Sequence, residues 1–352
     1  MSTTGDSDGS WTVCGASSDR YGQYVYYVSR YGPTQVLQFG LQKPVTDVGS
    51  EPLRHVRRII FFIPGESLDD SELLLTLVSA TASGNPGVIT MYHHFLSRLH
   101  QSLGVPVVGL SHVGQIREGI SRSKEPITVR KQVEHKLDFI ENVVPDDVEI
   151  VLMGHSIGTF MAVQVMRLLE KRERVVHTVM LMPVLEKFTQ SPGWKSLSLL
   201  LPFRFLAFLL VFLLSFVKDE IVLQLIPRLV PDMKRSRTPV CVLEGTLQLV
   251  NYRVFSNMLA LARDESCQVD VRDDLFLSKN LHKMSFFFCA DDRWVPLTFL
   301  RNLKRRFPSA QTELMDTVCH AFVVDKRMTE EVISRVATLL RTQLTASDGD
   351  MD

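Results

Sequence analysis

Residues 148–158 read VEIVLMGHSIG, an apolar strand that runs into a glycine-flanked serine. A helical pattern follows at once, from Thr159 to Arg172. In a strand–turn–helix of this kind, Gly154 and Gly158 let the strand and the helix approach closely. The strained turn lifts the hydroxyl of Ser156 clear of the sheet. The flanking elements therefore favour a nucleophilic serine over the alternative interpretation, an idle serine in a glycine-rich turn.

The helix after this turn also indicates where a developing negative charge would be stabilised. Its N-terminus points toward Ser156, and the partial positive charge at a helix N-terminus favours an oxyanion. The backbone N–H of Ile157, the residue after the serine, is expected to supply one oxyanion donor. These features are typical of acyl transfer through a serine.

Strand and helix patterns alternate through most of the chain. The apolar runs lack polar alternation, as strands buried on both faces do, and they cover residues 58–65, 105–110, 148–153, 175–182 and 284–290. Helical patterns lie at residues 91–103, 129–143, 159–172 and 329–344. Residues 24–39 alternate in polarity, which suits a strand or hairpin at a sheet edge. This order predicts an α/β fold with a doubly wound, mostly parallel sheet.

The alternation stops between about residues 192 and 267, where the text is helical and strongly apolar. We expect this stretch to form a helical lid over the carboxyl edge of the sheet. The chain thus divides into a disordered tail (residues 1–20), one α/β domain (residues 21–345) and a short acidic tail (residues 346–352).

The amino-acid composition argues against some classes of partner and cofactor. The 352 residues include 39 basic and 39 acidic side chains, so the formal net charge is zero and a nucleic-acid partner is not favoured. Five scattered cysteines without a C-x-x-C pair favour a reduced compartment. No histidine pair has metal-ligand spacing with a carboxylate partner, so we expect neither a metal nor another cofactor.

A serine nucleophile needs a base and an acid, which in this type of sheet follow it in the order Ser, Asp or Glu, His. Asp291 and Asp292 end the run 284–290, and His320 follows a further strand pattern at residues 311–315. Asp292 is the preferred acid and Asp291 the alternative. Either aspartate can instead be a cap of the following helix.

The other histidines carry structural expectations. His135 lies in helical text and is expected at the surface, whereas His177 lies inside a strand and is expected in the core. His155 is expected to line the serine turn without taking part in the chemistry. His112 either lines the pocket or is solvated.

The most apolar stretch runs from Ser196 to Val217, and its uninterrupted part, Phe205 to Leu214, is shorter than a spanning helix requires. Three interpretations remain open: a buried lid helix, a segment embedded in a lipid monolayer, and a transmembrane helix. In the second, the lipid-contacting side chains are Phe205, Phe208, Leu209, Phe212, Leu213 and Phe216.

Several motifs together resemble the lipid droplet-associated hydrolase family. They are GHSIG (154–158), SHVG (111–114), QVEHK (132–136), DRWVP (292–296) and HAF (320–322). The resemblance runs from about residue 36 to residue 340. It implies the α/β-hydrolase fold, association with lipid droplets and the cytoplasmic face of the endoplasmic reticulum, and hydrolysis of a neutral lipid ester such as a cholesterol ester. The family's catalytic residues map onto Ser156, Asp292 and His320.

One departure concerns the second oxyanion donor. The family carries an unbroken I-P-G-N-P-G, whereas here residues 66–84 separate Ile63-Pro64-Gly65 from Asn85-Pro86-Gly87. The donor is then the backbone N–H of Glu66 or of Asn85. Because losing one such donor lowers the rate by about 10²–10³-fold, the insertion also favours a weakly active or non-catalytic droplet protein as an alternative. An acyltransferase, in which an alcohol replaces water, is a further one.

Overall fold

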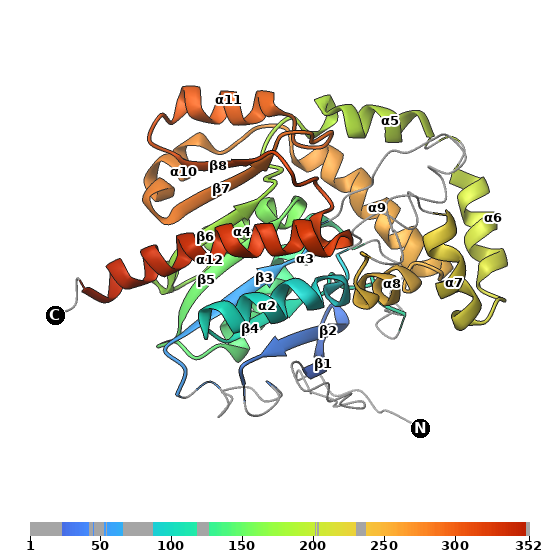
Figure 1. Cartoon of the computed structure of the whole chain (residues 1–352), viewed down its shortest axis with the longest axis horizontal. Coiled ribbons are helices and arrows are strands. Elements are labelled where there is room, and N and C mark those ends of the chain that lie inside the picture. The colour runs from blue at the N-terminus through green and yellow to red at the C-terminus, as the bar shows by residue number, and fades with distance from the viewer. Residues whose placement is uncertain are drawn as a thin grey trace.

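The described residues are organised around one eight-stranded sheet (Figure 1). The computed structural model describes residues 23–41, 45, 53, 55–65, 87–117, 127–200, 202, 204–229 and 237–349. The strands are β1 (Gln23–Ser29), β2 (Gly32–Phe39), β3 (Arg58–Ile63), β4 (Val107–Leu110), β5 (Glu149–His155), β6 (Val175–Leu181), β7 (Met284–Cys289) and β8 (Gln311–Met315). Their order across the sheet is β1-β2-β4-β3-β5-β6-β7-β8.

Among the described strands, β4, β3, β5, β6, β7 and β8 are parallel, and β2 alone runs in the opposite direction, antiparallel to both of its neighbours, β1 and β4. The predicted hairpin at a sheet edge is therefore confirmed, as is the mostly parallel, doubly wound α/β sheet. Every residue of β3 and of β7 is buried, because helices cover both faces of these strands. This burial explains why their sequences are continuous apolar runs rather than alternating ones.

Helices lie on both faces of the sheet (Figure 1). α2 (His93–Leu103) packs beside α12 (Lys326–Gly349), and α3 (Val129–Val143) packs beside α4 (Ile157–Leu168). α10 (Asp274–Asn280) precedes β7, and α11 (Leu297–Arg306) connects β7 to β8. The helix after the serine begins two residues earlier and ends four residues earlier than its sequence pattern predicts, at Ile157 and Leu168.

The domain boundaries drawn from the sequence stay predictions. α12 continues to Gly349, into the segment that we expected to be an acidic tail. The expected N-terminal tail, residues 1–20, and the inserted stretch, residues 66–84, lie outside the described residues.

Helices make up most of the described part of the predicted lid. It contains α5 (Pro192–Leu200), α6 (Arg204–Leu214), α7 (Asp219–Leu229), α8 (Val240–Leu247) and α9 (Tyr252–Gln268). In Figure 1 these helices gather at one end of the sheet. α5 is attached to the loop after β7, because the N–H of Gly193 donates to the carbonyl of Arg293 at 2.8 Å. α8 packs on the short helix η2 (Ile89–Tyr92).

The crossing of β5, α4 and β3 is packed without spare room. A Cβ built on Gly154 would lie 2.5 Å from the carbonyl oxygen of Gly158, and one on Gly158 would lie 2.3 Å from the carbonyl oxygen of Ile63. Both neighbours are backbone atoms, which cannot rotate away as a side chain can. The two glycines are thus required by the close approach of the three elements.

The substitution Gly158→Ala should therefore destabilise the protein far more than a glycine replacement elsewhere. We expect it to lower the free energy of unfolding by about 3 kcal/mol, because backbone must move to admit the methyl group. Gly104→Ala is the control: its φ is +68° and nothing lies within 4 Å of the added Cβ. Backbone strain alone should then cost about 1 kcal/mol. Urea unfolding measures both, and equal losses would contradict this packing argument.

Candidate active site

The turn between β5 and α4 presents Ser156 in a strained conformation, with φ 53° and ψ −125°. Three hydrogen bonds hold it there. The Ser156 N–H donates to the carbonyl of Leu181 at 2.9 Å, and the Ser156 carbonyl accepts from the N–H and the hydroxyl of Thr159 at 2.9 and 2.6 Å. A positive φ at a serine is costly, so its persistence at this turn points to a functional position.

The structure brings Ser156 together with two of the residues singled out from sequence. The Oγ of Ser156 lies 2.9 Å from Nε2 of His320, and Nδ1 of His320 lies 2.7 Å from Oδ2 of Asp292. Ser156 is 1% exposed, and the other two are each 6% exposed. Asp292 follows β7 and His320 follows β8, so three loops at the same edge of the sheet converge on this point.

The carboxylate of Asp292 is held by more than His320. Its Oδ1 accepts from the N–H groups of Trp294 and Val295, both at 2.8 Å, and its Oδ2 accepts from the thiol of Cys289 at 3.3 Å. Burial alone would raise the pKa of Asp292, but the charge and hydrogen bond of His320 and the two N–H groups outweigh it and lower the pKa. The carboxylate is therefore ionised at neutral pH, which orients Nδ1–H of His320 toward it.

The two neighbouring aspartates now differ clearly. Asp292 contacts His320, whereas Asp291 is exposed to solvent. The Asp292 carboxylate bonds to the N–H groups of Trp294 and Val295 in the loop before α11, whose N-cap is Pro296 and has no side-chain capping bond, so the interpretation of these aspartates as caps of the following helix is wrong.

The two flanks of the inserted stretch meet beside the serine. The N–H of Gly87 donates to the carbonyl of Gly65 at 3.0 Å, so the chain leaves and returns at one place. A Cβ on Gly65 would lie 2.5 Å from Cβ of Ser156, which puts the segment just after β3 in contact with the turn. Both expected positions of the second oxyanion donor, Glu66 and Asn85, lie outside the described residues. Ile157, the first expected donor, is the first residue of α4.

Tyr92 and His155 join this group, although the sequence pattern assigned them no part in the chemistry. The Tyr92 hydroxyl lies 2.7 Å from Nδ1 of His155, and Nε2 of His155 lies 3.0 Å from the carbonyl of His320. Both side chains are fully buried. Tyr92 lies in an apolar stretch whose pattern is equally consistent with a packed core tyrosine, so its sequence carries no functional signal.

A second buried polar group links α3 to the loop after β4. The side chain of Gln132 pairs with both backbone groups of Val113, and the Lys136 ammonium donates to the Ser111 carbonyl at 3.0 Å. Burial lowers the pKa of Lys136 and of its neighbour His135. The expectation that His135 is a surface residue is wrong, because the face of α3 that carries it packs inward. His112 is likewise buried rather than solvated.

The outer face of α6 is apolar and exposed. Five of the six side chains expected to contact lipid lie on it or just after it; Phe205 is 61% exposed, Phe216 is 74% exposed, and Leu209, Phe212 and Leu213 are each more than half exposed. Phe208 differs, because it is half-buried and its ring packs against Tyr252 and Phe255. Since only a narrow stripe of α6 (Ala207 and Val211) is fully buried, the interpretation of this segment as a buried lid helix is wrong.

Among the residues that the structure describes, no single helix is both long and apolar enough to cross a bilayer. Residues Pro192–Leu199 and Arg204–Leu214 satisfy length and composition as a pair, but they are bent by 80° relative to each other. In the same part of the chain, no group of three or more His, Cys, Asp or Glu side chains is placed to hold a metal ion.

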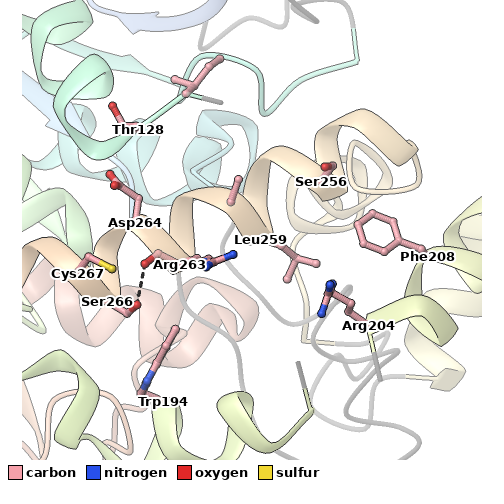
Figure 2. Close-up of a pocket in the computed structure, with 12 residues that line it drawn as sticks. Thr128, Trp194, Arg204, Phe208, Ser256, Leu259, Arg263, Asp264, Ser266 and Cys267 are labelled. Atoms are coloured by element: carbon pink, nitrogen blue, oxygen red, sulfur yellow. Dashed lines mark hydrogen bonds between the residues drawn. The ribbon is translucent and has the colours of Figure 1, made fainter. Parts of the chain in front are cut away.

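A cavity of about 680 Å³ lies between the lid helices and the start of α3. Figure 2 shows Leu259 and Arg263 on α9, with Phe208 and Arg204 facing them from α6 and Trp194 from α5. None of Ser156, Asp292 and His320 lines it. The cavity is thus distinct from the serine itself and lies behind the exposed face of α6.

Comparison with known proteins gives a consistent match. Residues 76–323 match the family model described as lipid-droplet associated hydrolase. A lipid droplet-associated hydrolase from Drosophila melanogaster is 30% identical over 77% of this chain and 90% of its own length. The one from Gallus gallus is 29% identical over 79% of this chain and 89% of its own.

Solved structures with low sequence identity share the fold. A serine hydrolase from the bacterium Cycloclasticus zankles superposes with a TM-score of 0.58 at 14% identity, covering 91% of this chain and 98% of its own. A soluble variant of monoglyceride lipase from Saccharomyces cerevisiae superposes with a TM-score of 0.51 at 12% identity, covering 92% and 96%. These matches identify the α/β-hydrolase fold.

Proposed function

The chain belongs to the lipid droplet-associated hydrolase family, and from this premise we propose that it is a serine esterase that cleaves a neutral lipid ester at the surface of a lipid droplet or of the endoplasmic reticulum. Ser156 is the nucleophile, His320 the base and then the acid, and Asp292 the residue that orients His320. The observation that carries the proposal is the continuous hydrogen-bonded line from Ser156 Oγ through the His320 ring to Asp292.

The first step follows from this line. Because Asp292 accepts the proton on Nδ1 of His320, Nε2 carries the lone pair and takes the proton from the Ser156 hydroxyl. The oxygen of Ser156 then attacks the ester carbonyl and forms a tetrahedral intermediate. The negative charge on the former carbonyl oxygen is stabilised by the N–H of Ile157, by the N-terminus of α4 and by a second N–H, from Glu66 or Asn85.

The second half of the reaction uses the same groups. The protonated His320 gives its Nε2 proton to the oxygen of the leaving alcohol, which leaves an acyl group on Ser156. Water, deprotonated by His320, then attacks the acyl carbonyl, and Ser156 regains its proton as the fatty acid departs. The ionised Asp292 stabilises the imidazolium of His320 in both halves.

Two surfaces of the lid support a lipid substrate. The exposed face of α6 suits insertion into a monolayer over neutral lipid, where an apolar helix enters and leaves on one side. Lys195, Arg204 and Lys218 flank it and can reach head groups. The cavity behind α6 has a volume typical of small-molecule sites and apolar walls at Trp194 and Phe208, and we infer that it takes the acyl chain.

The interrupted oxyanion loop favours one alternative, a droplet-bound protein with little or no turnover. Against it stands the hydrogen bond between Gly87 and Gly65, which keeps both flanks of the insertion beside Ser156. Acyl transfer to an alcohol differs from hydrolysis only in the second attacking group. A panel of cholesteryl oleate and triolein, with and without an added alcohol, separates these activities.

Ser156→Ala should abolish labelling by a fluorophosphonate probe, because no oxygen is left to attack phosphorus.

Asp292→Asn should lower kcat on the order of 10⁴-fold, because it leaves His320 in the wrong tautomer. The control Asp291→Asn changes an exposed carboxylate and should leave kcat within about twofold. Equal labelling of the wild type and Ser156→Ala would overturn the nucleophile assignment, and equal kcat values for the two aspartate variants would overturn the acid.

The variant Leu209→Glu/Phe212→Glu should bind triolein droplets coated with phosphatidylcholine at least tenfold less tightly than the wild type. Each of these side chains gains about 1.5–3 kcal/mol when buried in lipid, and the glutamates add a charge. The control Val271→Glu/Leu275→Glu changes two side chains that are 80% and 68% exposed near α10, at the other end of the molecule (Figure 1). Flotation assays measure both, and equal losses would argue against α6 as the lipid contact.

Ala260→Trp, which adds bulk inside the cavity, should lower kcat/KM for p-nitrophenyl palmitate by about tenfold or more and leave p-nitrophenyl acetate within about twofold. A short acyl group does not reach the filled space. Arg253→Trp adds the same side chain to an exposed position of α9 and serves as the control. If both esters slow equally in Ala260→Trp, the cavity does not hold the acyl chain.

A further inference from the structure

A chain of hydrogen bonds connects the end of β3, the serine turn and the loop that carries His320. The N–H of Gly65 lies 3.1 Å from the Tyr92 hydroxyl, which lies 2.7 Å from Nδ1 of His155. Nε2 of His155 lies 3.0 Å from the backbone carbonyl of His320. Tyr92 and His155 are each 0% exposed, so these bonds form without competing solvent.

The direction of every bond in this chain is determined. Burial, followed by the charge of His320, lowers the pKa of His155 to about 3, so its ring is neutral and carries one N–H. A carbonyl oxygen only accepts, so that N–H is on Nε2 and is donated to His320. Nδ1 must then accept the proton of the Tyr92 hydroxyl, whose oxygen accepts from Gly65.

We propose that Tyr92 and His155 are positioning residues, which hold the backbone of His320 and the end of β3 in the relative placement that catalysis needs. The inference rests on the proposed function. The anchored carbonyl belongs to the residue whose ring must meet Ser156, and the anchored N–H belongs to Gly65, which directly precedes a candidate oxyanion donor. Tyr92 and His155 thereby link the backbone of the base, His320, to the segment that precedes the candidate oxyanion donor.

The rings around His155 explain why a neutral histidine fits here. Its ring centroid lies 5.2 Å from that of His320 and 5.3 Å from that of Phe322. When His320 becomes an imidazolium during the reaction, a second cation at this distance would repel it, whereas a neutral ring does not. A histidine also has a donor and an acceptor on opposite sides of a rigid ring, which this relay requires.

Tyr92→Phe tests the proposal, because it removes one hydroxyl and keeps the ring. It leaves the Gly65 N–H and His155 Nδ1 without this partner, so we expect kcat and the rate constant of fluorophosphonate labelling to fall about tenfold, with KM within about twofold. Tyr27→Phe is the matched control. Tyr27 is 4% exposed, and its hydroxyl bonds to Asp138, at a distance from the serine in the edge hairpin. It should lower the melting temperature and leave kcat unchanged.

Two substitutions of His155 distinguish a positioning role from a contribution to fold stability alone. His155→Gln keeps a donor that can reach the His320 carbonyl and should retain more of the labelling rate than His155→Leu, which keeps none. All rates are measured at a temperature well below each variant's melting temperature. Equal kcat values for Tyr92→Phe and Tyr27→Phe, or equal labelling of the two His155 variants, would overturn the inference. Absence of labelling in the wild type would instead overturn the proposed function.

Discussion

The architecture depends on one backbone conformation, the positive φ at Ser156 between β5 and α4. It is stable because the sheet on one side and α4 on the other both bond to this residue, and because glycines at 154 and 158 leave only backbone between the elements. Contacts with the sheet and with α4 therefore offset the cost of this strained backbone conformation. The geometry of the proposed triad follows from it, since Asp292 and His320 contact Ser156 at the edge where the parallel strands end.

Sequence predicted most of the frame and part of the site. Continuous apolar runs identified the buried parallel strands, because burial on both faces leaves no reason for polar alternation. Chain order and loop position predicted that Ser156, Asp292 and His320 lie together, and the structure places them in hydrogen-bond contact. The sequence carried no signal for the contacts of Tyr92, because a buried tyrosine in an apolar stretch looks the same whether or not its hydroxyl has a partner. His135 was misjudged because polar side chains at helical spacing resemble a solvated face, whereas here Gln132 and Lys136 bond the loop after β4 and His135 is buried beside them.

The orientation of the lid helix α6 could also not be predicted from the spacing of its apolar residues. A run such as Phe205 to Leu214 is apolar on all sides, so its pattern cannot say which side faces the protein. The structure supplies that information: Ala207 and Val211 face inward, Phe208 packs against α9, and the larger side chains face out. The bulky side chains of α6 therefore form a broad external surface.

The N–H of Gly87 donates to the carbonyl of Gly65, so these two residues stay together beside Ser156. The number of residues between them can therefore change without changing the geometry of the site. For a flexible segment, a roughly tenfold increase in length adds only about 2 kcal/mol of loop-closure free energy. The position is thus a permissive point for insertion, at which evolution or a protein engineer can add sequence without repacking the core. A reporter peptide inserted between Gly65 and Gly87 would have both of its ends beside Ser156.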